Sequence, residues 1–242
     1  HGGASGGINA LPDEKVEAIE KFVEELSGDV SLGHLGLNAG KGISSHAFGK
    51  LSEVDSRSAL RFEMYGEDTL ETYLAALGPV VSADQLINLD GKTIAIEGFG
   101  EHGPAMIDLI EERGGKVISI STLSGSISEP SSFDTADIRG RWGESGVDFV
   151  KSADGEVEPA WKVFQSGADI LFTGSKMGAV NHLTAEKLKV AALVPHQPIP
   201  FTARALAILQ RNNTIVVPDF IAVAAPIFAS WPGENTDVSQ VI

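Results

Sequence analysis

Three closely spaced glycines are the residues of this chain best placed to bind a ligand. Gly98, Gly100 and Gly103 form the pattern Gly-x-Gly-x-x-Gly directly after the apolar run at residues 93–96. In such a pattern the first glycine permits a tight turn, the second lets the backbone approach a pyrophosphate, and the third lets a helix pack close to a strand. The helix that follows would direct its N–H groups and the positive end of its dipole at the phosphates. The pattern therefore predicts a dinucleotide-binding turn.

Other side chains near this turn are further candidate contacts. Phe99, Glu101 and His102 occupy the variable positions of the pattern, and we count them with the glycines as expected cofactor-binding residues. A carboxylate at Glu101 would disfavour phosphates unless it points away from them. His102 is either a pH-sensitive ligand contact or an exposed, solvated ring, and the glycines could equally serve the turn and the helix packing alone. Lys176 and His182, which follow a later apolar strand, could contact a substrate or a phosphate.

The elements around the turn indicate how it is held in place. Apolar runs of strand character alternate with amphipathic segments from residue 93 to residue 218, which predicts a mostly parallel sheet with helices on both faces. Ligands of such a doubly wound α/β fold bind at the carboxyl ends of the strands. The expected strands are residues 93–97, 116–121, 169–173, 190–194 and 214–219, and the expected helices include 104–112, 134–146, 184–188 and 202–211. A polar loop is expected at residues 122–129.

The first part of the chain is expected to be helical. Apolar residues recur at helical spacing over residues 11–26 and 57–77, and a short helix is expected at 40–50. The chain begins at His1 inside a glycine-rich stretch, which leads us to expect that it is part of a longer polypeptide.

Charge and composition disfavour several kinds of partner. The 242-residue chain has a formal net charge of −15, whereas nucleic acids and anionic membranes attract basic proteins. It contains no cysteine, so disulfides and thiolate metal sites are impossible, and its histidines lack the spacing of metal ligands. No apolar run reaches the length of a membrane span. We therefore expect a cytoplasmic protein without a metal site.

Several segments together resemble the glutamate dehydrogenase branch of the amino-acid dehydrogenases. The segments are Gly2–Gly7, Gly91–Gly103, Ser121–Ile127, Asp169–Leu171 and Val216–Asp219. The first is similar to the family's Gly-Gly-x-Lys-Gly-Gly loop, the second to the strand and glycine turn of its cofactor domain, and the third to the loop after the next strand. The segments occur in the family's order and at its spacing, so the resemblance covers almost the whole chain.

The side chains that carry the family's chemistry are replaced in this chain. Ser5 stands where the resemblance implies a catalytic lysine, and Asn38 stands where it implies a catalytic aspartate. A hydroxyl without a partner base and an amide cannot transfer protons at neutral pH. Tyr65 replaces a threonine that would touch the nicotinamide amide. The loop after the second strand offers Ser121 and Thr122 as cofactor contacts, but Thr122 replaces the acidic residue that binds a ribose hydroxyl.

The resemblance implies both an organisation and two candidate functions. It implies a Rossmann-like domain at residues 89–231, preceded by part of a second α/β domain at 1–88 and followed by a tail at 232–242. It also implies NAD or NADP as cofactor and assembly as a homo- or hetero-oligomer. One candidate function is that of a catalytically degenerate pseudoenzyme kept as a structural or regulatory subunit. The other is an NAD(P)-dependent oxidoreductase that acts on an amino or keto acid with altered catalytic residues. We expect no catalytic group at the substituted positions.

Overall fold

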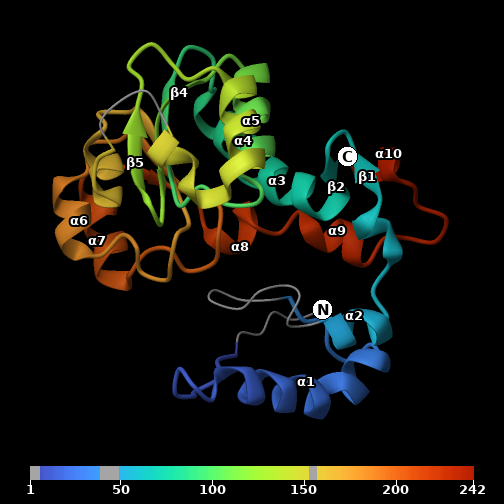
Figure 1. Cartoon of the computed structure of the whole chain (residues 1–242). Coiled ribbons are helices and arrows are strands. Elements are labelled where there is room, and N and C mark those ends of the chain that lie inside the picture. Colours follow the sequence, from blue (N-terminus) through green and yellow to red (C-terminus); the bar gives the residue numbers. More distant parts are fainter. Residues whose placement is uncertain (1–5, 39–48, 153–156) are drawn as a thin grey trace. The chain divides into compact units, whose positions relative to one another are not determined.

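The computed structural model describes residues 6–38, 49–152 and 157–242. The chain divides into two compact units, His1–Ser58 and Ala59–Ile242 (Figure 1). This division precedes the domain boundary that the sequence places after residue 88, because the helix leading into the sheet belongs to the second unit. Within the described ranges, no helix is long and apolar enough to cross a membrane.

The regular elements in the described part of the first unit are helices, joined by loops and turns. These are α1 (Lys15–Ser31) and α2 (Gly49–Val54). Ile19, Val23 and Val30 lie on one face of α1 and form a small buried cluster with Leu51 of α2. The helix expected at residues 11–26 is confirmed in its centre, but it starts later and runs further. It continues because burying Val30, which is 1% exposed, outweighs the weak helix propensity of residues 27–29. The short helix expected at 40–50 lies mostly outside the described residues.

The single long helix expected at residues 57–77 is wrong, because a hairpin interrupts it. The observed elements are a 3₁₀ turn η2 (Ala59–Phe62), strands β1 (Met64–Tyr65) and β2 (Asp68–Thr69), and helix α3 (Leu70–Ile87). Gly66 adopts a φ of +64°, a left-handed conformation that glycine accepts without strain and that a helix does not contain. The Thr69 side chain then accepts a hydrogen bond from the Thr72 N–H group, which caps the start of α3.

The second unit is built on a six-stranded sheet in the order β5-β4-β3-β6-β7-β8. Its strands are β3 (Thr93–Glu97), β4 (Lys116–Thr122), β5 (Gly125–Ser128), β6 (Ile170–Thr173), β7 (Ala192–Pro195) and β8 (Ile215–Val216). All neighbours are parallel except β4 and β5. The mostly parallel sheet is therefore confirmed. The loop expected at 122–129 is wrong: Thr122 pairs with Gly125 across a two-residue turn, and the chain returns as the edge strand β5.

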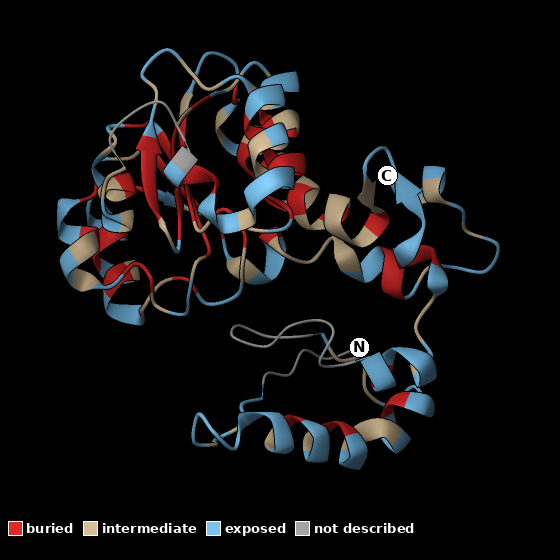
Figure 2. Ribbon diagram, in the orientation of Figure 1, coloured by how far each residue is buried: buried red, intermediate tan, exposed pale blue. Residues whose placement is uncertain are grey.

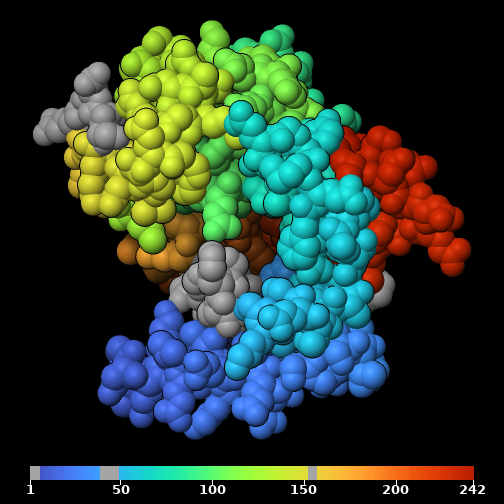
Figure 3. Space-filling view, turned by 45° about the vertical axis from the view of Figure 1, so that its right-hand side comes forward, coloured from blue at the N-terminus to red at the C-terminus, as the bar shows by residue number. Residues whose placement is uncertain are grey.

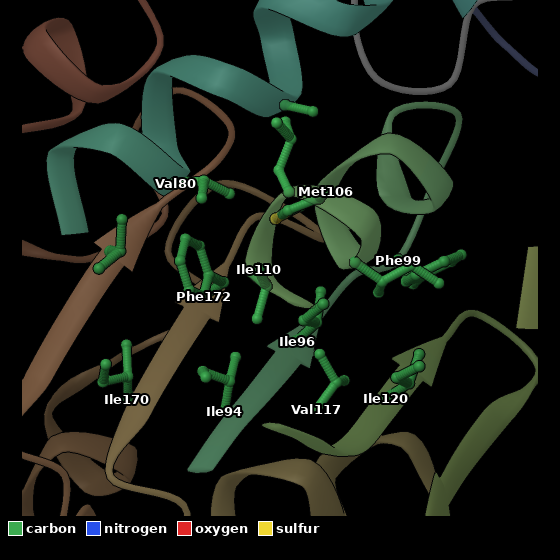
Figure 4. Close-up of a cluster of buried hydrophobic side chains, with 14 of the residues drawn as sticks. Val80, Ile94, Ile96, Phe99, Met106, Ile110, Val117, Ile120, Ile170 and Phe172 are labelled. Atoms are coloured by element: carbon green, nitrogen blue, oxygen red, sulfur yellow. The ribbon is translucent and has the colours of Figure 1, made fainter. Parts of the chain in front are cut away.

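Helices cover both faces of this sheet and bury it. They include α4 (Gly103–Glu112), α5 (Thr135–Ser145), α6 (His182–Lys187) and α7 (Ala203–Arg211), with 3₁₀ turns η3 (Gly146–Ser152) and η4 (Ala160–Gln165). Figure 2 shows the strands of this sheet largely in the colour of buried residues. Ile94 and Ile96 belong to the larger core cluster with residues of α3 and α4 (Figure 4), whereas Ala95 belongs to the cluster with residues of α6 and α7. The register between β3 and β4 shifts after Ile94, so that Val117 and Ile120 both face the larger cluster.

The C-terminal segment packs back onto the start of the second unit. It contains α8 (Asp219–Ala222), α9 (Pro226–Ser230) and α10 (Val238–Val241). Ala229 of α9 is buried in one cluster with Leu60 of η2 and with Leu70 and Leu74 of α3. In the space-filling view the cyan segment that contains these early residues accordingly lies beside the red C-terminal segment (Figure 3).

Candidate functional site

The glycine turn lies at the topological switch point of the sheet, where the strand order reverses. β3 has β4 on one side and β6, the start of the second half of the sheet, on the other. In open α/β sheets, ligands bind at the carboxyl edge of such a switch point. The N–H groups of Gly98 and Phe99 both donate to the Ser121 carbonyl, at 3.1 and 2.8 Å, and the Gly103 N–H donates to the Gly100 carbonyl at 2.8 Å. The predicted turn between strand and helix is therefore formed at this point.

Each glycine of the turn has a different reason to lack a side chain. Gly98 has a φ of +86°, and a Cβ atom there would lie 2.4 Å from the Ser175 nitrogen. At Gly103 a Cβ atom would lie 2.7 Å from the Phe99 ring. At Gly100 its nearest neighbour would be the Gly98 carbonyl oxygen at 3.8 Å, so Gly100 faces open space. Gly98 and Gly103 thus serve packing, and the free approach to Gly100 is what a dinucleotide phosphate requires.

The side chain of Phe99 packs into the hydrophobic core beneath the sheet's glycine turn and holds the turn in place. Its side chain is 2% exposed, and its ring centroid lies 5.4 Å from each of the rings of Trp142 and Phe149. Figure 4 shows the ring pointing into the core near Ile96. Phe99, one of the predicted cofactor contacts, can therefore contact a ligand only through its backbone.

Glu97, which sequence reasoning did not select, fastens the neighbouring loop. Its side chain is buried at the end of β3, and one carboxylate oxygen, Oε2, accepts three hydrogen bonds. The donors are Thr173 Oγ1 at 2.8 Å, the Gly174 N–H at 3.0 Å and the Ser175 N–H at 3.2 Å. This arrangement holds the loop after β6 against the glycine turn. An acidic residue at the end of an otherwise apolar strand was the only available signal.

Two buried histidines extend this set of contacts. His196, directly after β7, places Nε2 2.9 Å from the Glu97 carbonyl and Nδ1 2.9 Å from Nε2 of His102. His102 is 7% exposed, so the sequence-based alternative of an exposed ring is wrong. Burial, and after it the neighbouring His196, lower the pKa of His102 from 6.5 to about 3. The His102 ring is therefore neutral and faces the protein interior.

The remaining predicted cofactor contacts, Ser121, Thr122 and Glu101, differ in their burial and in the hydrogen bonds that they already make. Thr122 is buried, and its hydroxyl donates to the Val147 carbonyl at 2.7 Å while accepting from the Ser124 N–H at 3.0 Å. The hydroxyl oxygen of Ser121 accepts from the Gly98 N–H at 3.4 Å. Glu101 is exposed. The Thr122 proton is thus used within the protein and is not offered to a ribose.

Of the substituted catalytic positions, Asn38 belongs to the first unit. Ser5 falls outside the described residues. The Asn38 amide oxygen accepts a hydrogen bond of 2.7 Å from Arg57 Nη1, and the same guanidinium is paired with Asp55, whose side chain is 5% exposed. Tyr65 lies in β1 of the second unit, with its ring 4.5 Å from that of Tyr73. In the described ranges, no group of three or more His, Asp or Glu residues is arranged to hold a metal ion.

A cavity elsewhere in the second unit does not belong to this site. It has a volume of about 210 Å³ and is lined by residues that include Gly167, ahead of β6, and Val190, ahead of β7. It therefore lies towards the amino ends of these strands, and none of the predicted site residues lines it.

A parallel sheet with a glycine turn and a helix N-terminus at its switch point defines a dinucleotide-binding fold. Residues 73–230 match the Glutamate/Leucine/Phenylalanine/Valine dehydrogenase family, and the chain belongs to this family. The match runs from α3 through α9 and so includes the entire sheet.

Curated relatives support the same assignment. The chain is 32% identical to a glutamate dehydrogenase of Thermotoga maritima over 152 residues, which are 62% of this chain and 36% of the relative. It is 27% identical to glutamate dehydrogenase A2 of Halobacterium salinarum over 144 residues, 60% of this chain and 34% of the relative. The matched part therefore spans about a third of the length of these relatives.

Solved structures show the same fold at lower identity. The hetero-hexameric glutamate dehydrogenase of Thermus thermophilus, in its Leu-bound form, superimposes with a TM-score of 0.69 at 19% identity, covering 92% of this chain and 56% of that chain. The Plasmodium falciparum glutamate dehydrogenase gives a TM-score of 0.65 at 17% identity, covering 92% and 52%.

Proposed function

We propose that this chain is a catalytically degenerate member of its family that keeps a nucleotide-binding turn and acts as a structural or regulatory subunit. The observation that carries the proposal is Asn38. Its position corresponds, by the family resemblance, to the proton-transferring aspartate, and its amide oxygen is occupied by the Arg57 guanidinium at 2.7 Å. An amide does not titrate, so Asn38 cannot take up or release a proton. Ser5, at the position of the lysine, supplies no charge either.

The residues around Gly100 fit NAD or NADP at the phosphates. The backbone of the glycine turn and the first turn of α4 would hold the pyrophosphate, and the open space at Gly100 admits it. When bound, the nicotinamide of such a cofactor accepts or donates a hydride. The ribose of the cofactor would find fewer partners, because Thr122 carries no charge and its hydroxyl donates to the Val147 carbonyl. The neutral threonine neither favours NAD through a carboxylate nor repels the additional phosphate of NADP.

An assembly role follows from the same losses. A subunit without its own proton-transfer groups is useful where it positions or regulates a second chain. One solved structure with this fold is described as a hetero-hexameric glutamate dehydrogenase, so subunits of different sequence occur together in that protein. We propose that this chain likewise assembles with an active homologue or with copies of itself.

The absence of glutamate oxidation is the direct test of the degenerate role. We expect no measurable reduction of NAD or NADP with glutamate, because losing a positioned acid or base costs roughly 10²–10⁴-fold in rate. The assay follows the absorbance of the reduced nicotinamide cofactor, with an active glutamate dehydrogenase as the positive control. Turnover at an ordinary enzymatic rate would contradict the proposal and would support the alternative of an oxidoreductase with altered catalytic residues.

Nucleotide binding is tested separately through Gly100. We expect NADH or NADPH to raise the melting temperature of the wild-type protein, since a ligand at about 100 times its Kd adds ~2.7 kcal/mol of stability. Gly100→Ala should keep the wild-type melting temperature without ligand, because its Cβ enters open space, and should lose most of the ligand-induced shift. Differential scanning fluorimetry measures both quantities. An absence of any shift in the wild-type protein with either cofactor would contradict cofactor binding.

A further inference from the structure

A single backbone carbonyl joins the ends of three strands near the glycine turn. The Glu97 carbonyl, directly before Gly98, accepts from the Gly174 N–H at 3.0 Å and lies 2.9 Å from His196 Nε2. Glu97 ends β3, Gly174 follows β6, and His196 follows β7. His196 in turn reaches His102, the residue at the N-cap of α4. The two rings thus connect the far strand β7 to both ends of the turn.

The hydrogen bonds assign the proton positions of both rings. A carbonyl oxygen only accepts, so Nε2 of His196 must carry a hydrogen. In a neutral ring Nδ1 is then the acceptor, and the hydrogen between the rings must belong to Nε2 of His102. A hydrogen on Nδ1 of His196 as well would reverse this bond, because His102 would then have to accept at Nε2 and carry its own hydrogen on Nδ1. The bond to the Glu97 carbonyl requires a hydrogen on His196 Nε2 in either case.

The surroundings favour the neutral state of the two rings. Both rings are buried, His102 to 7% and His196 to 2% exposure, and the positive end of the α4 dipole disfavours a cation at the N-cap. Packing leaves the His196 ring little freedom, because a Cβ atom at Gly174 would lie 2.5 Å from its Cε1 atom. The ionisable groups on the neighbouring segments include Glu97, whose carboxylate is held by the loop, the exposed Glu101 and Lys176, and Asp219, whose Oδ2 accepts from the Ile199 N–H.

We propose that His102 and His196 are a positioning pair that holds the glycine turn in its phosphate-binding conformation. They do so by fixing the carbonyl before Gly98 and the N-cap of α4 to the same rigid strand end. Neither ring touches the ligand. This inference rests on the proposed nucleotide binding of the same turn, but its structural part can be observed without a ligand.

The affinity test compares a disruptive with a conservative substitution. His196→Leu removes both hydrogen bonds and should weaken NADH binding about tenfold, given the modest net worth of each bond. His196→Gln can still donate and accept, and should recover most of the affinity. His34→Leu changes an exposed histidine of the first unit. It is the matched control and should bind NADH like the wild-type protein. Affinities are measured by NADH fluorescence, and a folded His196→Leu protein with wild-type affinity would overturn the proposal.

Two ligand-free measurements separate this proposal from the proposed function. Imidazole ¹⁵N spectra of the wild-type protein near neutral pH should show a hydrogen on Nε2 of His196, as donation to the Glu97 carbonyl requires. A His196 ring without a hydrogen on Nε2 would overturn the pair. Hydrogen exchange of the Gly98 and Phe99 amides should be about tenfold faster in His196→Leu, while amides within β4 stay protected. If wild-type protein binds neither NADH nor NADPH, the proposed function fails, and unchanged exchange at Gly98 and Phe99 would overturn the positioning role as well. His102→Leu serves as the second variant if His196→Leu does not fold.

Discussion

Gly98→Ala is expected to lower the free energy of unfolding by about 2–5 kcal/mol. Gly98 has a φ of +86°, where an L-residue is strained, and its new Cβ atom would lie 2.4 Å from the nitrogen and 2.5 Å from the Cα atom of Ser175. Both are backbone atoms, so no side-chain rotation relieves the overlap. Ser175 cannot withdraw easily either, because its N–H group is held by the Glu97 carboxylate.

Gly100→Ala is the matched control for this substitution. It changes the same residue type two positions further on, where the nearest atom to a Cβ would be 3.8 Å away, and should alter stability by less than ~0.5 kcal/mol. Urea unfolding at neutral pH, followed by circular dichroism, measures both variants. Equal stability of the two variants would show that the loop after β6 does not lie against Gly98.

Stability is expected to fall steeply below pH 6.5 because His102 resists protonation. The folded pKa of His102 is about 3, against 6.5 for an unperturbed ring, so the unfolded chain takes up the proton first. The contribution of the neutral ring is therefore fully present above pH 6.5 and is lost as the pH falls towards 3. The slope is about 1.4 kcal/mol per pH unit, which gives a loss of about 2 kcal/mol between pH 6.5 and pH 5.

His102→Gln isolates this effect from the titration of other groups. A glutamine does not titrate, so the variant should lose less stability than the wild-type protein between pH 7 and pH 5, by about 2 kcal/mol. His34→Gln changes an exposed ring in the first unit and should keep the wild-type pH dependence. The measurement is urea unfolding at closely spaced pH values. Parallel curves for wild-type protein and His102→Gln would contradict a buried neutral His102.

Local patterns in the sequence were sufficient to predict the framework of the site. Residues close together in the sequence determine the strand β3, the turn at Gly98 and the helix α4. The same holds for α5, which is preceded by its N-cap Asp134 and followed by its C-cap Gly146. The hairpins β1–β2 and β4–β5 were not predicted, because the local pattern of each segment points to another structure. The apolar spacing over residues 57–77 is compatible with a helix, and only the left-handed Gly66 breaks it. The strand β5 is short, and its pairing with β4 supplies a stability that its polar residues do not indicate.

The polar contacts of the site could not be predicted, because they join residues far apart in the chain. Glu97 and Ser175 are 78 residues apart, and His102 and His196 are 94 apart. Nothing in the segment around His102 indicates that the ring turns inward, since its partner is supplied by the end of β7. The sequence could thus locate the turn, whereas only the fold reveals what fixes it.

The shared carbonyl of Glu97 also limits how this region can change over evolutionary time. Loss of His102 alone would leave His196 with an acceptor nitrogen that no longer has a donor, and loss of His196 alone would strand the buried hydrogen of His102. The least harmful route replaces both rings together by apolar residues of similar volume. A single apolar replacement at either position leaves a buried polar atom without its partner, at a cost of about 1–3 kcal/mol, so we expect apolar residues to appear at both positions together.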